Sequence, residues 1–252
     1  MEQAIEEFKK YTNDYLNLSN MCVLKVSHTL RVVDLCGKIA KELNLSTEDI
    51  GLAKLCGLLH DIARFEQWKR YQTFVDSKSI DHGDLGVEIL KQNNFIRKFN
   101  NDESLDDLIL TTVKNHNKYK IEEGLTEREK LFCNIVRDAD KIDIIYLYTT
   151  GEITINVEDD YISDKIYNQI QQKSIIVRLD RKTKADILCT SLGFVFDINY
   201  KESFKILKER NYINKEIDIY QNKQINKKLK EQLENIRKIV NDYIDRRCKD
   251  VR

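Results

Sequence analysis

The chain has 252 residues, and its 42 Lys and Arg balance its 42 Asp and Glu. A chain without net charge has no bulk positive field, which excludes a nucleic-acid binder that works through net charge. With 8 Gly and no Pro, the composition disfavours turn-rich β-sandwiches and barrels. It favours an all-α fold, because helices tolerate these two residues least.

Apolar residues recur with a helical period along most of the first 150 positions. The polar run Ser46-Thr47-Glu48 provides an N-cap signal before one of these stretches. Helices are predicted over residues 3–17, 22–43, 47–62, 84–93, 103–118 and 126–148.

The pattern changes after Gly151. Apolar residues alternate with polar ones from Ile153 to Val157 and return at 175–179, which suggests a short β-hairpin near 152–180. Helical periodicity resumes from about residue 183. An apolar stripe over 222–247 either packs on the body of the protein or pairs with a second copy in a homodimer. We therefore expect a helical core over 1–150 and a mainly helical extension over 151–252 that packs on it.

Several features indicate a cytoplasmic protein without a membrane partner. No apolar run approaches the roughly 18 residues of a membrane-spanning helix, and the N-terminus lacks a signal-peptide core. The 6 Cys show no CxxC spacing, as expected for reduced, buried thiols. A Lys-rich stretch over 223–230 is offset by Glu231 and Glu234, so nucleic acid is not expected as a partner.

The 4 histidines all lie in the first 116 residues. His28 and His116 each fall on the apolar stripe of a predicted helix, so both side chains should point inward. His60 shares its helix face with small residues, which lets another helix come close. A buried imidazole without a partner costs a few kcal/mol, and one shared metal ion would satisfy several imidazoles together.

Carboxylates accompany these histidines. Asp61 directly follows His60 at the end of a buried helix, where an unpaired charge is expensive. A further carboxylate is expected from the segment 137–143, whose helix is apolar on two sides. Periodicity alone does not choose between Asp138 and Asp140 there.

The order of these residues, His28, then His60-Asp61, then Asp140, resembles the H…HD…D pattern of the HD superfamily of metal-dependent phosphohydrolases. The resemblance rests on two segments, Leu58-Leu59-His60-Asp61-Ile62 and Ala139-Asp140-Lys141-Ile142-Asp143. The second favours Asp140 as the last ligand and keeps Asp138 as the alternative. His82 and His116 lie between the pair and the final Asp, as in two-metal members of the superfamily.

The resemblance implies an HD-domain helical bundle whose metal ligands are His28, His60, Asp61, His82, His116 and Asp140. It also implies one or two divalent ions, drawn from Mn, Fe, Ni, Co, Zn or Mg. Water activated by the metal would attack a phosphate ester or anhydride, with a small nucleotide as the expected substrate and partner. Asp61 would bridge the metals, and Arg64 and Lys114 would complete the catalytic residues. A di-iron oxygenase on the same ligands, or a non-catalytic nucleotide-binding module, are the alternatives.

Overall fold

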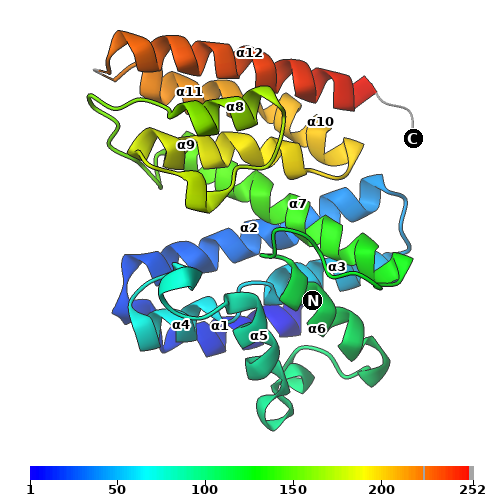
Figure 1. The fold of residues 1–252 in the computed structure, drawn as a ribbon. Coiled ribbons are helices and arrows are strands. Elements are labelled where there is room, and N and C mark those ends of the chain that lie inside the picture. Colours follow the sequence, from blue (N-terminus) through cyan, green and yellow to red (C-terminus); the bar gives the residue numbers. More distant parts are fainter. Residues whose placement is uncertain (224, 250–252) are drawn as a thin grey trace. The chain divides into compact units, whose positions relative to one another are not determined.

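The computed structural model describes residues 1–223 and 225–249. The chain divides into two compact units, Met1–Asp140 and Lys141–Arg252. All regular elements of the described residues are helices, as predicted from the scarcity of Gly and Pro, and no strand occurs among them (Figure 1).

The first unit contains all the histidines. Its longer helices lie close to their predicted positions, except that α4 was not expected as a separate helix. They are α1 (Glu2–Asn13), α2 (Asn20–Glu42), α3 (Thr47–Leu59), α4 (Arg64–Tyr71), α5 (His82–Lys91), α6 (Asp106–Asn115) and α7 (Glu127–Thr150), the last of which continues past residue 140.

Side-chain caps fix where two of these helices begin. The Ser46 hydroxyl accepts a hydrogen bond from the Asp49 amide at the start of α3, as its N-cap signal predicted. The Asp81 carboxylate accepts from the amides of Gly83 and Asp84 at the start of α5. That cap makes His82 the first residue of its helix.

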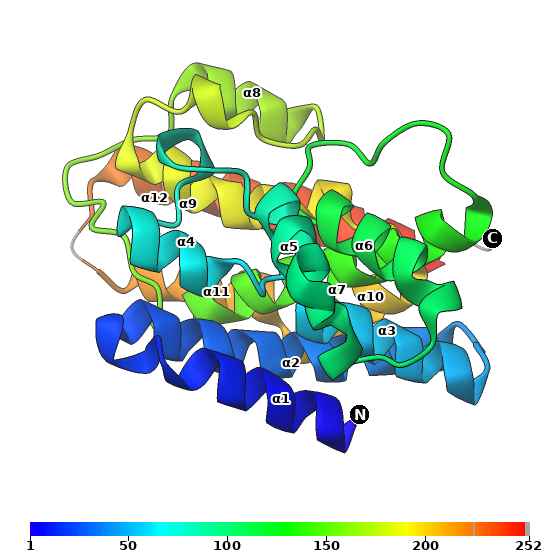
Figure 2. The same cartoon turned by 90° about the horizontal axis from the view of Figure 1, so that it is seen from below.

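A close approach of α2 and α3 brings two of the histidines together (Figure 2). Gly57 makes this possible, because a Cβ atom at that position would lie 2.8 Å from the Cys36 Sγ and 3.4 Å from the Val32 carbonyl oxygen. The interface is apolar, and Val32, Cys36 and Cys56 are all fully buried. The small residues noted around His60 therefore serve the contact that the sequence predicted.

The second unit is also helical. Its apolar stripe on α12 is buried within the unit, where α12 packs against α8, α10 and α11, and a homodimer stays a prediction. The bounds of its helices are α8 (Asp164–Gln171), α9 (Lys184–Gly193), α10 (Lys201–Arg210), α11 (Tyr212–Gln221) and α12 (Lys227–Lys249).

The β-hairpin predicted near 152–180 is wrong. The segment before α8 has turns and irregular backbone, and its amides bond to a helix end and a side chain instead of another strand. The Ile153 amide donates to the Leu147 carbonyl, and the Ile155 amide donates to the Tyr220 hydroxyl. Its alternation of apolar and polar residues thus reflects packing of one side against helices, and α8 occupies part of the stretch assigned to the hairpin.

A carboxyl group is buried in the core of the second unit. Glu216 on α11 is fully buried, and its Oε1 accepts a hydrogen bond from the Ser191 hydroxyl of α9. Its Oε2 has no hydrogen-bond partner among the described residues. Burial raises the pKa of Glu216 to about 8, and the Ser191 hydroxyl opposes this rise. We infer that this side chain carries a proton at neutral pH.

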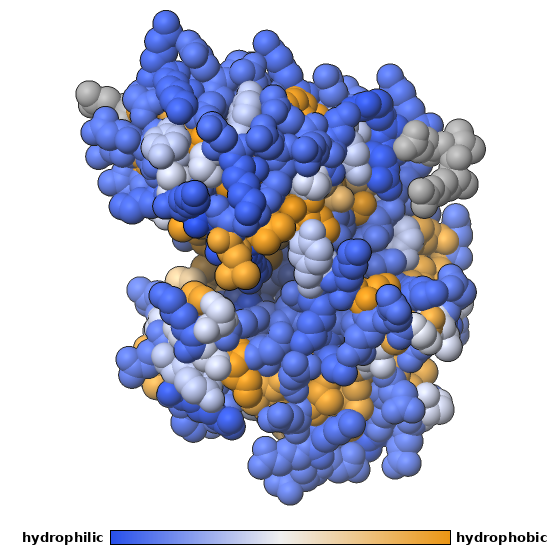
Figure 3. Space-filling model, viewed as in Figure 1, coloured by the Kyte–Doolittle hydropathy of each residue, from blue (hydrophilic) through white to orange (hydrophobic). Residues whose placement is uncertain are grey.

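Hydrophilic side chains cover most of the face drawn in Figure 3, with apolar patches between them. Among the helices of the described residues, none combines the length and apolar character that crossing a bilayer requires.

Candidate metal centre

Helices α2, α5 and α7 and the turns directly after α3 and α6 supply the predicted ligand residues. His28 lies within α2, and Asp140 lies on α7. The other three histidines occupy helix ends: His60 follows α3, His82 begins α5 and His116 follows α6. At a helix end the backbone turns away, which leaves space beside the side chain for ligands from neighbouring elements.

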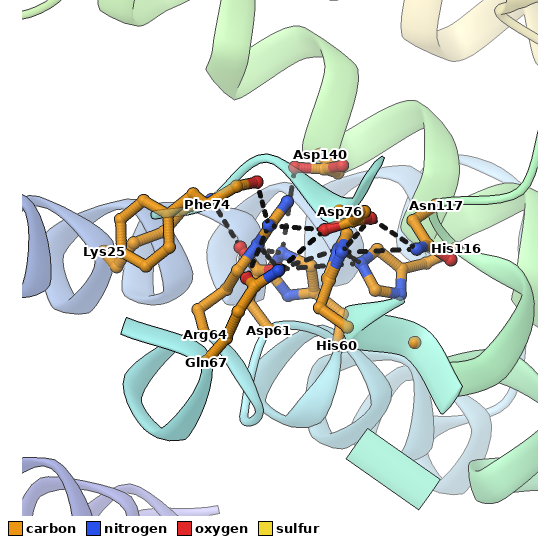
Figure 4. A network of polar contacts seen from close by, with 12 residues as sticks. Lys25, His60, Asp61, Arg64, Gln67, Phe74, Asp76, His116, Asn117 and Asp140 are labelled. Carbon is orange, nitrogen blue, oxygen red and sulfur yellow. Dashed lines mark hydrogen bonds and ion pairs between the residues drawn. The ribbon is translucent and has the colours of Figure 1, made fainter. Parts of the chain in front are cut away.

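One group forms around His28 and His60. Their Nε2 atoms lie 3.3 Å apart. Asp61 Oδ2 lies 3.5 Å from the His28 Nε2 and 3.4 Å from the His60 Nε2. Asp140 Oδ1 lies 3.2 Å and 3.7 Å from the same two nitrogens. Four side chains therefore converge on one point, and Figure 4 shows Asp140 reaching it from α7.

A second group forms around the other oxygen of Asp61. Oδ1 lies 3.4 Å from the His82 Nε2 and 3.6 Å from the His116 Nε2. The two imidazole nitrogens lie 3.0 Å from each other. All three residues are buried. Asp61 thus presents one carboxylate oxygen to each group, which is the geometry of a ligand that bridges two ions.

Hydrogen bonds at Nδ1 fix the orientation of three imidazoles. The Nδ1 atom of His60 lies 2.7 Å from the Gly57 carbonyl, and that of His116 lies 2.7 Å from the Val113 carbonyl. The Nδ1 atom of His82 lies 2.7 Å from Asp76 Oδ2. Since these oxygens only accept, each Nδ1 carries the hydrogen, and in a neutral ring Nε2 is then a lone pair directed into the cluster.

The second group has the electrostatics of a cation site. Burial lowers the pKa of His82 to about 3, with the Arg64 guanidinium acting in the same direction. Burial likewise lowers the pKa of His116. Both rings are therefore neutral at pH 7, and two nitrogen lone pairs face each other across 3.0 Å. A cation between them would turn this repulsion into two coordination bonds.

The first group also suits a divalent ion. Burial would lower the pKa of His60, but Asp61 and Asp140 outweigh it and raise that pKa to about 10. A proton on this ring therefore offsets the carboxylates, and a metal ion would replace that proton. Ligand atoms on one ion lie about 3.0–3.4 Å apart when each bond is about 2.1 Å. The contacts within the cluster lie in or near this range, so the residues present fit the metal ions expected from the sequence.

Two basic side chains hold Asp61 in place. Arg64, expected among the catalytic residues, places its Nε 3.2 Å from Asp61 Oδ1. Lys25, which the sequence reasoning missed, places its Nζ 2.5 Å from Asp61 Oδ2. Lys25 precedes His28 by one helical turn and so shares its face of α2, which is the signal that could have found it.

The structure does not bring Lys114, predicted as a catalytic residue, to the cluster. Its Nζ lies 2.5 Å from Glu122 Oε1, and its side chain is 42% exposed. Two residues along α6 correspond to about 200° of rotation, so Lys114 leaves the helix on the side opposite to His116.

The same rotation separates the two aspartates considered for the last ligand. The Asp140 carboxylate faces His28 and His60, whereas Asp138 lies about 200° around α7. Asp138 is fully buried. The geometry therefore favours Asp140, and its role as a ligand stays a prediction.

Comparison with known proteins agrees with this geometry. Residues 26–145 match the family model of the HD domain, and this range contains all six residues of the two groups. No curated protein and no solved structure matches the chain significantly.

Proposed function

Because residues 26–145 form an HD domain with a buried His/Asp cluster able to hold metal ions, we propose that the protein is a metal-dependent phosphohydrolase. Its substrates are phosphate esters or anhydrides, and nucleotides are the class we expect. A small phosphate compound is thus its main partner, without a role for membranes or nucleic acid.

One observation carries the proposal. The two oxygens of Asp61 face separate groups of histidine nitrogens, at 3.4–3.5 Å on one side and 3.4–3.6 Å on the other. Ions held in such a pair of sites supply an acidified water and positive charge for the phosphoryl oxygens. This combination suits in-line displacement at phosphorus.

The chain itself contributes orientation and charge. Lys25 and Arg64 each bind one oxygen of Asp61, so the carboxylate is held from both sides. Their side chains are 15% and 13% exposed, which keeps a small solvent-facing surface at each cation. A phosphate group entering there meets two positive charges in a region largely shielded from water, where their attraction is stronger than in bulk solvent.

Phosphate release tests the proposal. Chelator-treated protein would be loaded with Mn²⁺, Fe²⁺, Co²⁺, Ni²⁺, Zn²⁺ or Mg²⁺ and offered nucleoside mono-, di- and triphosphates, dinucleotides, cyclic dinucleotides and simple monoesters. We expect metal-dependent turnover of one of these classes, and a loss of at least about 100-fold in Asp61→Asn.

Two outcomes would contradict the hydrolase assignment. Metal-loaded protein that releases phosphate from none of these compounds would do so, as would Asp61→Asn with undiminished turnover. Turnover of iron-loaded protein that requires O₂ would support the oxygenase alternative. Tight nucleotide binding without turnover would support the non-catalytic module.

A further inference from the structure

Asp76 supports the second group of the metal centre from the segment between α4 and α5. It is the first residue of a short 3-10 helix, Asp76–Lys78. Its Oδ2 accepts a hydrogen bond from the His82 Nδ1 at 2.7 Å and another from the Asn117 amide at 3.2 Å. Its Oδ1 accepts from the Arg64 Nη1 at 3.1 Å (Figure 4). The carboxylate therefore joins a ligand of the second group to the guanidinium that holds Asp61.

A buried glutamine fixes the segment that carries Asp76. The Gln67 side chain on α4 is fully buried. Its amide nitrogen donates to Asp76 Oδ1 at 2.9 Å, to the Ser79 hydroxyl at 2.9 Å and to the Ile80 carbonyl at 3.0 Å. Asp76 thus has a defined position from which to orient the His82 ring.

The two groups differ in their ligands. The first has His28, His60, Asp61 and Asp140, whereas the second has Asp61, His82 and His116. A group with one carboxylate fewer is expected to hold its ion more weakly. Within that weaker group, the His82 lone pair faces the ion only when its Nδ1 hydrogen is taken by Asp76.

Through Arg64, Asp76 also supports the one oxygen of Asp61 that faces the second group. Arg64, which Asp76 binds, contacts Asp61 Oδ1, the oxygen that faces the second group. Lys25 contacts Oδ2, the oxygen that faces the first group. Substitutions at Asp76 should therefore weaken the binding of the second ion and leave the affinity for the first one largely unchanged.

We propose that Asp76 is a positioning residue that sets the affinity of the second, weaker metal ion by fixing the tautomer and orientation of His82. The two ions then load in order, and a one-ion form precedes the two-ion form. This inference rests on the metal centre of the proposed function.

The test is a Mn²⁺ titration of the chelator-treated full chain, followed by calorimetry and by electron paramagnetic resonance, which distinguishes isolated from coupled ions. Asp76→Ala should weaken the second ion about 10- to 100-fold and keep the affinity of the first. Asp76→Asn retains an oxygen that accepts from His82, so its second affinity should lie between those of the wild type and Asp76→Ala. Ser79→Ala is the matched control, because it removes a bond to Gln67 in the same segment while the Asp76–His82 contact stays.

The outcomes separate the inference from the proposed function. Equal weakening of both ions in Asp76→Ala and Asp76→Asn would show a general structural role and overturn the inference, as would wild-type affinity for the second ion in both. A wild-type protein that binds one ion would also overturn it while leaving a one-metal hydrolase standing. A wild-type protein that binds none would contradict the proposed function itself.

Discussion

Replacing Glu216 by glutamine should change how the stability of the protein depends on pH. Burial raises the pKa of Glu216 from 4.5 to about 8. Between these two values the folded chain keeps the proton while the unfolded chain has lost it, so unfolding releases a proton. The free energy of unfolding therefore falls as pH rises, by about 1.4 kcal/mol per pH unit.

The size of the effect follows from the width of this window. From pH 4.5 to about pH 8, the accumulated loss reaches at most about 5 kcal/mol. It levels off at higher pH, where both states have lost the proton. Glutamine cannot titrate, so Glu216→Gln should gain stability relative to the wild type as pH rises through this window.

Urea unfolding monitored by circular dichroism at pH 5, 6, 7 and 8 measures this difference. Hydrogen exchange of peptides from α9 and α11 assigns it to the second unit. Comparing the two proteins at each pH cancels the titration of the histidine cluster, which both share. Glu158→Gln, at an exposed position of the same unit, controls for the loss of one acidic residue. A difference between Glu216→Gln and the wild type that stays constant with pH would refute the reasoning.

Three further outcomes are expected. Lys25→Met should lower the rate of phosphate release about 100-fold, because it removes a charge beside Asp61. Lys114→Met should keep that rate within about 2-fold of the wild type, because its side chain pairs with a glutamate elsewhere. Equal losses of the two variants in steady-state assays would contradict the placement of both lysines. Gly57→Ala should cost about 1–3 kcal/mol in urea unfolding, because its Cβ would meet the Cys36 sulfur at 2.8 Å, while Gly51→Ala, with open space around it, should be neutral or stabilising. Removing metal with a chelator should lower the melting temperature, since an ion at 100 times its Kd contributes about 2.7 kcal/mol; an unchanged melting temperature would mean that no ion had been bound.

The parts of the molecule that sequence predicted well depend on local signals. A helix is visible from its apolar period, and His28 and His116 could be assigned to buried faces from that period alone. The order of the histidines and Asp61 then pointed to a shared centre. None of these predictions requires knowledge of how the chain runs between the helices.

The parts that sequence missed depend on tertiary contacts. A lysine on a helix is usually solvated, and the one-turn spacing of Lys25 before His28 is informative only once the contact of α2 with α3 brings His28 close to Asp61. Lys25 then binds Asp61, whereas Lys114 does not. Asp76 lies between helices, and its contact with His82 arises only once Gln67 fixes that segment. The alternation after Gly151 resembles a strand because an irregular segment that buries or half-buries every second residue, as at 153–157, has the same period of two.

The sharing of Asp61 between the two groups has a consequence for how this centre can change by mutation. A substitution at His82 or His116 removes a ligand from the second group and leaves the first group complete. A substitution at Asp61 damages both groups in one step. A one-ion centre can therefore arise by a single substitution at either of these histidines, whereas a substitution at Asp61 cannot remove one ion site and keep the other intact.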